Sequence, residues 1–447
     1  MKTTVIATAV ASLVFAGAVQ AQANAFSSFF KSTGSEEDPA KVAQAADAYA
    51  DKHADWARPF MKSLYRDGEW GAVLNFNRLG LAAMEQQQFG TARKAFDQAI
   101  VRVEAIYADD ANAAKARSVF NAEQVKDFKG EPYERAMLYY YRGLLYLQEG
   151  DYQNARAAFL AADRHDTLSS AEDKAFAGDF GMMKYLAGWA SSCDGDTVRA
   201  AHLIDEAQKA DVTVRALPAM PGKTLVLLDV GSAPVKWGDG QYKHILKIKA
   251  GTADTAAPRL RRADGAERSD LAAIGDIDFQ ATTRGGREID GVMAGKAQFK
   301  DTAGTVGDTA LAVGSALAAN ASMLGDSGMA NLGMAGMLIG LVAKGIEKAA
   351  NPQADVRAWD TLPAKVLVQM SDDSAAAPFA LVVAGQAQVL PLQSTHGACT
   401  VAWGRSRSAL DSPAGGAADA GVPAEANRGD RNRAFRSMLS TEMVAAK

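Results

Sequence analysis

Small and large apolar residues recur in the same order three times in the first half of the chain. Each copy has a glycine, an anchor position, an alanine, a large apolar residue and a second alanine. The copies are Gly80, Phe89, Ala92, Phe96, Ala99; Gly143, Tyr152, Ala155, Phe159, Ala162; and Gly188, Thr197, Ala200, Ile204, Ala207. The later positions have helical spacing, so each copy predicts a helical hairpin. We expect each glycine to receive the large side chain of the second helix.

This pattern resembles the tetratricopeptide repeat, whose glycine, alanine and aromatic positions it matches in order. The best-matching stretch is Tyr139–Tyr152, and the departures are Arg142 and Ala187, where leucine is usual. The copies also lie further apart than the usual ~34 residues, so residues 109–135 and 164–180 must hold extra helix or loop. Upstream, residues 39–66 predict one or two helices that cap the array.

The resemblance also indicates where a partner would bind. In tetratricopeptide arrays the first helices line a concave groove, and the side chains around each glycine point into it. Carried onto this chain, the groove positions are Asn77, Leu81, Met84, Tyr140, Leu144, Leu147, Tyr185, Trp189 and Ser192. The set is apolar and aromatic where a solvated face would be charged, which predicts an exposed protein-binding groove. The alternative is that the long inter-repeat segments fold back and make these residues ordinary core.

The periodicity changes after the breaker sequence Leu217–Gly222. Apolar runs of strand length follow at Thr224–Val230, Tyr242–Lys249, Ala364–Met370, Phe379–Ala384, Ala387–Leu392 and Ala398–Trp403. These runs predict a second, mostly β domain. The predicted fold class is therefore α + β, with a tetratricopeptide-like domain over residues 36–216 and an α+β domain over residues 222–405.

Between the strands lies a segment, Thr309–Ala343, in which Asp326 is the single charged residue. Gly325–Gly328 divides it into two apolar stretches, and each is shorter than the ~20 residues that span a bilayer. We favour a buried helical hairpin packed on the sheet. The alternative is insertion into a membrane or a partner's channel, because the Gly336–Gly340 pattern also allows close helix packing in membranes.

The two termini predict export and a tail without a core. Lys2, an apolar run over Val5–Val19 and small residues up to Ala25 are typical of a Sec signal peptide, placed at residues 1–23. The cleavage region contains no cysteine, so the mature protein is expected in the periplasm without a lipid anchor. Residues 406–447 are rich in Ala, Gly, Ser and charge, which predicts disorder.

Charge and cysteine content narrow the picture further. The net charge of −4 argues against binding to nucleic acid, because no surplus of cations exists to neutralise phosphates. The chain has two cysteines, Cys193 and Cys399. An oxidising compartment permits a bridge between them, but their wide separation favours two buried thiols.

Three segments together resemble an uncharacterised family of bacterial envelope proteins, namely Tyr139–Tyr152, Val230–Lys236 and Ala354–Ala364. Many members of that family are lipoproteins, often encoded beside a protein similar to the curli secretion channel. The resemblance implies no catalytic residues. In the third segment we expect a structural corner in which Asp355 caps, Arg357 pairs and Trp359 fills the core.

Motifs for catalysis and metal binding are weak. Gly325–Gly328 echoes a serine-protease loop and Gly222–Thr224 the end of a phosphate-binding loop, but both lack the required context. The pair His165–Asp166 is expected to form a solvated turn rather than a metal site. We therefore expect no enzyme activity, cofactor or metal. The leading hypothesis is a periplasmic scaffold or adaptor that holds another envelope protein, such as a curli-secretion-channel-like outer-membrane protein, in its groove. The alternative is a structural subunit of an outer-membrane secretion or surface-fibre apparatus.

Overall fold

A computed structural model describes residues 37–108, 127–167, 180–220, 222–240, 245–254, 256–262, 264–282, 354–371, 378–411 and 429–443. The predicted signal peptide, the segment Thr309–Ala343 and most of residues 109–135 and 164–180 lie outside these residues. The described chain has a helical first half and a sheet-rich second half, which confirms the α+β fold class.

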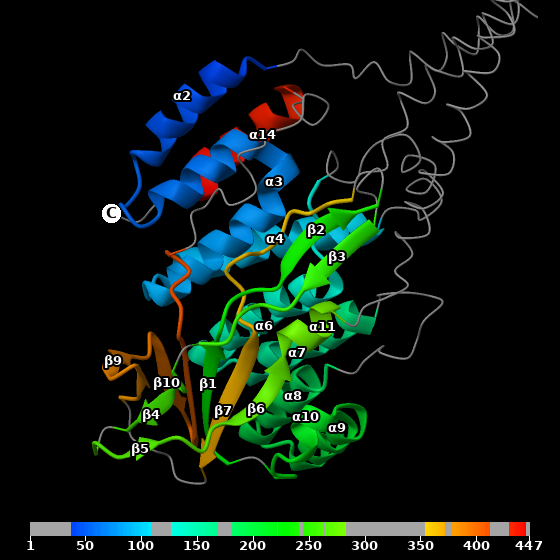
Figure 1. Cartoon of the computed structure of the whole chain (residues 1–447), viewed down its shortest axis with the longest axis vertical. Coiled ribbons are helices and arrows are strands. Elements are labelled where there is room, and N and C mark those ends of the chain that lie inside the picture. The colour runs from blue at the N-terminus through cyan, green and yellow to red at the C-terminus, as the bar shows by residue number, and fades with distance from the viewer. Residues whose placement is uncertain are drawn as a thin grey trace, which may run out of the picture.

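Among the described residues of the first half, the helices pair into three antiparallel hairpins (Figure 1). They pair α3 (Arg58–Glu85) with α4 (Phe89–Ala108), α6 (Pro132–Glu149) with α7 (Tyr152–Thr167), and α8 (Met182–Cys193) with α9 (Thr197–Ala210). The helix α2 (Pro39–Ala50) packs on α3, and the short α10 (Val212–Arg215) follows α9. The three helical hairpins predicted from the repeats are therefore present.

The repeated glycines explain why the helices of each hairpin lie so close together. A Cβ atom at Gly80 would lie 2.6 Å from Cε1 of Phe96, and one at Gly188 would lie 2.6 Å from Cγ1 of Ile204. Gly143 is in the same way pressed against the ring of Phe159. All three large side chains are fully buried, as the repeat pattern predicted.

The described residues of the second half form three sheets. The largest has five strands in the order β10-β11-β1-β7-β6, and its bounds are β1 Thr224–Val230, β6 Ala272–Asp276, β7 Lys365–Ser371, β10 Leu392–His396 and β11 Cys399–Arg405. The four-stranded sheet has the order β5-β4-β8-β9, with bounds β4 Arg259–Arg261, β5 Glu267–Arg268, β8 Ala380–Val383 and β9 Gln386–Val389. A separate hairpin joins β2 (Val235–Asp239) to β3 (Ile245–Lys249), and the short helix α11 (Ile277–Thr282) packs on β3.

The strand predictions hold in part. The run Thr224–Val230 forms β1 over the same residues, and the runs ending at Met370 and Trp403 match β7 and β11 within two residues. The run Ala387–Leu392 is wrong as a single strand. It is divided between β9 and β10, which belong to different sheets, because Pro391 interrupts the ladder where the chain changes sheet.

The prediction of disorder over residues 406–447 is wrong for the C-terminal helix. Residues Gly429–Glu442 form α14, which packs on α3 beside α2 (Figure 1). Phe435, Leu439 and Met443 are buried, and they recur at helical spacing within a segment otherwise dominated by charge. The average composition of residues 406–447 concealed this amphipathic stretch.

The predicted helical and α+β domains share one hydrophobic core. The buried cluster runs without a break from Phe76 and Tyr141 in the first half to Trp359 and Trp403 in the second. Strands β1, β7, β10 and β11 lie alongside the first helices of the array (Figure 1). The sheet therefore occupies the side of the array on which the groove was predicted.

Candidate functional site

The predicted groove residues are core residues. Asn77, Leu81 and Met84 on α3, Tyr140, Leu144 and Leu147 on α6, and Tyr185 and Trp189 on α8 are each at most 2% exposed; Ser192 is half-buried. The structure brings them to one face of the array, as the resemblance implied, but the prediction of an exposed groove is wrong. The chain's own five-stranded sheet covers that face, an occupant that the repeat pattern alone does not reveal.

Hydrogen bonds tie both ends of the groove to the segments that precede β1 and β7. At the α8 end, the indole Nε1 of Trp189 donates to the carbonyl of Gly222 at 2.8 Å, and the hydroxyl of Tyr185 donates to the carbonyl of Pro218 at 2.8 Å. At the α3 end, Nε of Arg78 donates to Oδ1 of Asp360 at 2.7 Å. These groups would be costly to leave unpaired in a dry interface, so the cover belongs to the fold.

A buried carboxylate lies at the centre of this interface. Asp229, at the end of β1, accepts hydrogen bonds from the hydroxyls of Tyr141 at 2.7 Å and Tyr140 at 3.4 Å. Arg405 is the register neighbour of Asp229 on β11. Its Nε lies 3.2 Å from Oε1 of Glu85. Burial raises the pKa of Asp229 to about 6, although Arg405 and the tyrosine hydroxyls act in the opposite direction. Burial likewise raises the pKa of both tyrosines well above 10.

A second buried ion pair anchors the β2–β3 hairpin to the array. Nζ of Lys236 on β2 lies 2.6 Å from Oε2 of Glu134 on α6 and donates to the carbonyl of Arg357 at 3.0 Å. The other oxygen of Glu134 accepts from the backbone N–H of Trp359 at 2.7 Å. The predicted corner is confirmed, since Asp355 accepts from the backbone and side chain of Arg357, and Trp359 is 1% exposed.

The two cysteines form a disulfide, so the prediction of two buried thiols is wrong. Cys193 ends α8 and Cys399 begins β11, and their Cα atoms are 5.9 Å apart. The wide separation of the two cysteines along the chain did not predict their distance in space, because the sheet packs back onto the helical array. The bridge joins the array covalently to the sheet that covers its groove.

His165 and Asp166 are buried on α7, so the prediction of a solvated turn is also wrong. Nε2 of His165 lies 2.9 Å from Oε1 of Glu104, which also accepts from the hydroxyl of Tyr139. Burial lowers the pKa of His165. Within the described residues, no group of three His, Cys, Asp or Glu side chains is placed to hold a metal. The cluster joins three helices and therefore supports the packing of the array.

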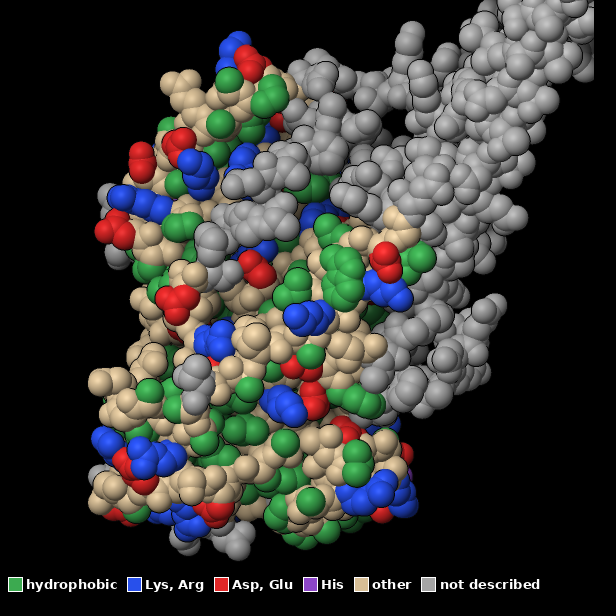
Figure 2. Space-filling view, in the orientation of Figure 1, with side chains coloured by type: hydrophobic (Ala, Val, Ile, Leu, Met, Phe, Trp, Pro, Cys, Tyr) green, Lys and Arg blue, Asp and Glu red, His purple; other side chains and the backbone are tan. Residues whose placement is uncertain are grey.

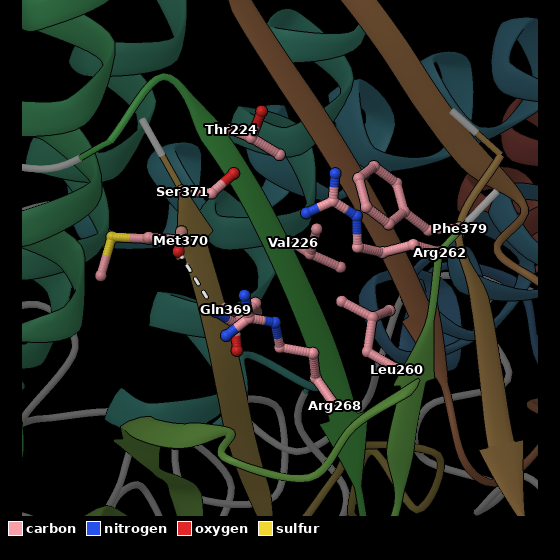
Figure 3. A pocket seen from close by; sticks show the side chains of 9 residues that line it. All are labelled: Thr224, Val226, Leu260, Arg262, Arg268, Gln369, Met370, Ser371 and Phe379. Carbon is pink, nitrogen blue, oxygen red and sulfur yellow. Dashed lines mark hydrogen bonds between the residues drawn. The ribbon is translucent and has the colours of Figure 1, made fainter. Parts of the chain in front are cut away.

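A small cavity opens between the two larger sheets (Figure 3). Its walls come from β1, β4, β5 and β7, and the lining residues are Thr224, Val226, Leu260, Arg262, Arg268, Gln369, Met370, Ser371 and Phe379. The side chains of Arg262 and Arg268 reach across it from the β4–β5 side (Figure 3). Its volume of about 20 Å³ is enough for a single water molecule and too small for an organic substrate.

Two exposed features of the described residues are candidates for contact with other molecules. One is the outer edge of β9, all of whose residues are exposed. The other is the outer face of the β2–β3 hairpin, which carries Val235, Trp237 and Ile245. Neither surface was predicted from the sequence. The alternation of apolar and charged residues in Val235-Lys236-Trp237 was a signal for the second, whereas the first depends on which strands pair.

Comparison with protein-family models, with curated proteins and with solved structures gives no match for this chain. In the described residues, no helix is both long and apolar enough to cross a membrane.

Proposed function

We propose that this chain is a non-enzymatic scaffold of the bacterial envelope that holds an extended segment of another envelope protein along the outer edge of β9. The observation that carries the proposal is that β9 is an exposed, uncharged edge strand. Since the groove of the array is filled by the sheet, the partner is assigned to this edge instead. A free strand edge is a template for pairing with another chain.

The other edges of the two larger sheets are covered or charged, and both strands of the β2–β3 hairpin carry lysine. The edge strand β10 lies against α6, where Oγ of Ser394 donates to the carbonyl of Gln148 at 2.8 Å. The edge strand β6 is in contact with α10, and β5 consists of Glu267 and Arg268. By contrast β9 reads Gln-Ala-Gln-Val and lies at the outside of the molecule (Figure 1). Charged side chains are the usual protection of an edge, and β9 has none.

The geometry of β9 leaves two backbone donors for a partner. A two-residue turn at Ala384 and Gly385, with φ values of 48° and 81°, connects β8 to β9. In such hairpins the residues that flank the turn are hydrogen-bonded to each other, and alternate residues point outward. The same alternation continues beyond β9, where the backbone N–H of Leu390 donates to the carbonyl of Phe379 at 3.0 Å. The N–H groups of Ala387 and Val389 therefore face away from β8.

Export to the periplasm through the predicted signal peptide is part of the same proposal. The supporting features are the charged start, the apolar run and the small residues before Phe26. An outer-membrane protein similar to the curli secretion channel is one candidate for the partner, on the family resemblance alone. The periplasmic location and the identity of the partner are both properties of the native host. The binding experiment is therefore made in cells of that host.

The experiment places a photo-crosslinking amino acid at Val389 in the full chain, in cells, and identifies the crosslinked peptide by mass spectrometry. Ala387→Pro removes one outward N–H and should abolish the crosslink, whereas Ala387→Thr retains the N–H and should preserve it. Thermal unfolding checks that both variants are folded. Equal crosslinking of the two variants, or no crosslink in the parent chain, would contradict binding along the β9 edge.

A further inference from the structure

The β2–β3 hairpin has two chemically different faces. Its inner face carries Lys236, which is fixed by the ion pair with Glu134, and the half-buried Ile248 opposite it. Its outer face carries the alternate residues of both strands. Trp237 lies opposite Lys247, and Val235 lies opposite Lys249. The hairpin is therefore anchored from within and presents a separate set of side chains outward.

That outer face is apolar and basic. Val235 is 58% exposed, Trp237 44% and Ile245 41%. Lys247 and Lys249 are exposed on the same face and make no ion pair with any residue of the described chain, and Asp239 is the acidic residue at its end. Figure 2 shows hydrophobic and basic side chains next to each other over this part of the surface. The two lysines would pair with anionic groups, and the exposed tryptophan would be buried favourably against apolar groups. A partner that offers both is therefore anionic at its surface and apolar beneath.

The size of the face decides between a protein and a lipid surface. A stable protein interface buries about 800 Å² on each partner, and three half-exposed side chains supply only a fraction of that area. A lipid surface needs no matching contour. Tryptophan is enriched where hydrocarbon meets headgroups, and lysine interacts with anionic headgroups while its stem lies along apolar groups.

We propose that the outer face of the β2–β3 hairpin binds the surface of an anionic phospholipid membrane. Trp237, Val235 and Ile245 enter the boundary between headgroups and acyl chains, and Lys247 and Lys249 pair with lipid phosphates. The strand edge of β9 belongs to a different sheet, so lipid contact and partner binding use separate surfaces.

The tryptophans of the chain make this proposal directly measurable. Trp237 is the most exposed of the six, since Trp56 is half-buried and the rest are buried, namely Trp70, Trp189, Trp359 and Trp403. Vesicles that contain lipids brominated on the acyl chains quench tryptophans that enter the bilayer. The full chain is mixed with vesicles of phosphatidylethanolamine and phosphatidylglycerol, or with vesicles of phosphatidylcholine, and both sedimentation and quenching are recorded.

We expect quenching with the anionic vesicles, its loss at high salt, and its absence in Trp237→Phe. The charge reversal Lys247→Glu with Lys249→Glu should weaken vesicle binding more than tenfold. Lys41→Glu with Lys52→Glu, on the exposed surface near α2, changes the net charge equally and should leave binding unchanged. No sedimentation with either vesicle, sedimentation without quenching of Trp237, or equal loss in the two charge-reversed variants would overturn the proposal.

Discussion

At the scale of single residues, the close glycine contacts could be predicted from the sequence, whereas the partners of the buried carboxylate could not. Gly80, Gly143 and Gly188 could be paired with Phe96, Phe159 and Ile204 from the sequence alone, because both members of each pair recur at fixed spacing. Asp229 could not be placed in this way. Its partners Tyr140, Tyr141 and Arg405 come from a helix and a strand far away in the chain, and no local pattern connects them.

Asp229 makes the stability of the protein depend on pH in an unusual direction. Its carboxyl binds a proton more tightly in the folded state, with a pKa of about 6, than in the unfolded chain, where the ordinary value is 3.8. The stabilisation linked to this proton is therefore complete below about pH 4 and is lost as pH rises through 6. Asp229→Asn removes the titration and leaves an amide oxygen that still accepts from the tyrosine hydroxyls.

Urea unfolding of the parent chain and of Asp229→Asn, between pH 4 and pH 7, measures this effect. The free energy of unfolding of the parent, relative to the variant, should fall by up to about 3 kcal/mol over that range. Arg405 and Glu85 face the same site and are present in both proteins, so their contributions largely cancel in the difference. A difference that does not change with pH, or that rises with pH, would contradict the account of Asp229.

At the scale of elements, local periodicity predicted the helical hairpins and the long central strands, whereas context decided the remaining elements. The short strands β4, β5 and β9 are too brief to have a clear period. Pro391 divides one apolar run between two sheets, which a hydrophobicity pattern does not report. Helix α14 was missed because three buried residues lie in a tail with the composition of a disordered segment.

The contacts of α14 predict that it stabilises the N-terminal end of the array. The ring of Phe435 lies 6.0 Å from that of Phe76, the guanidinium of Arg436 binds the carboxylate of Glu37 at 2.7 Å, and the carbonyl of Leu439 accepts from Tyr49. Truncation after residue 428 removes all of these contacts. Since burial of a large side chain contributes about 2–5 kcal/mol, the loss should be at least about 3 kcal/mol.

Hydrogen exchange would locate this effect. In the truncated chain the amides of α2 and of the first turns of α3 should exchange faster, while those of α8 and α9 stay protected. A second truncation that removes residues 444–447 serves as the matched control and should change neither stability nor exchange. Unchanged protection of α2 after loss of α14 would show that the helix contributes nothing to the array.

At the scale of the whole molecule, the array and the sheet form one body. The sheet fills the concave side of the array, hydrogen bonds join the two along the interface, and Cys193–Cys399 links them covalently at one end. The repeat pattern identified the residues of the groove correctly but not what lies on them. The repeat pattern reflects contacts between neighbouring hairpins only. It therefore does not predict that a distant part of the same chain packs into the groove.

The closed groove is the central claim of this account, and hydroxyl-radical footprinting of the intact, oxidised chain tests it most directly. Mass spectrometry reports the oxidation of each aromatic side chain, and the exposed Trp237 provides the internal standard. The account predicts that Tyr140, Tyr185 and Trp189 remain at background while Trp237 is oxidised. Oxidation of those three residues at a rate close to that of Trp237 would show an open groove and contradict it.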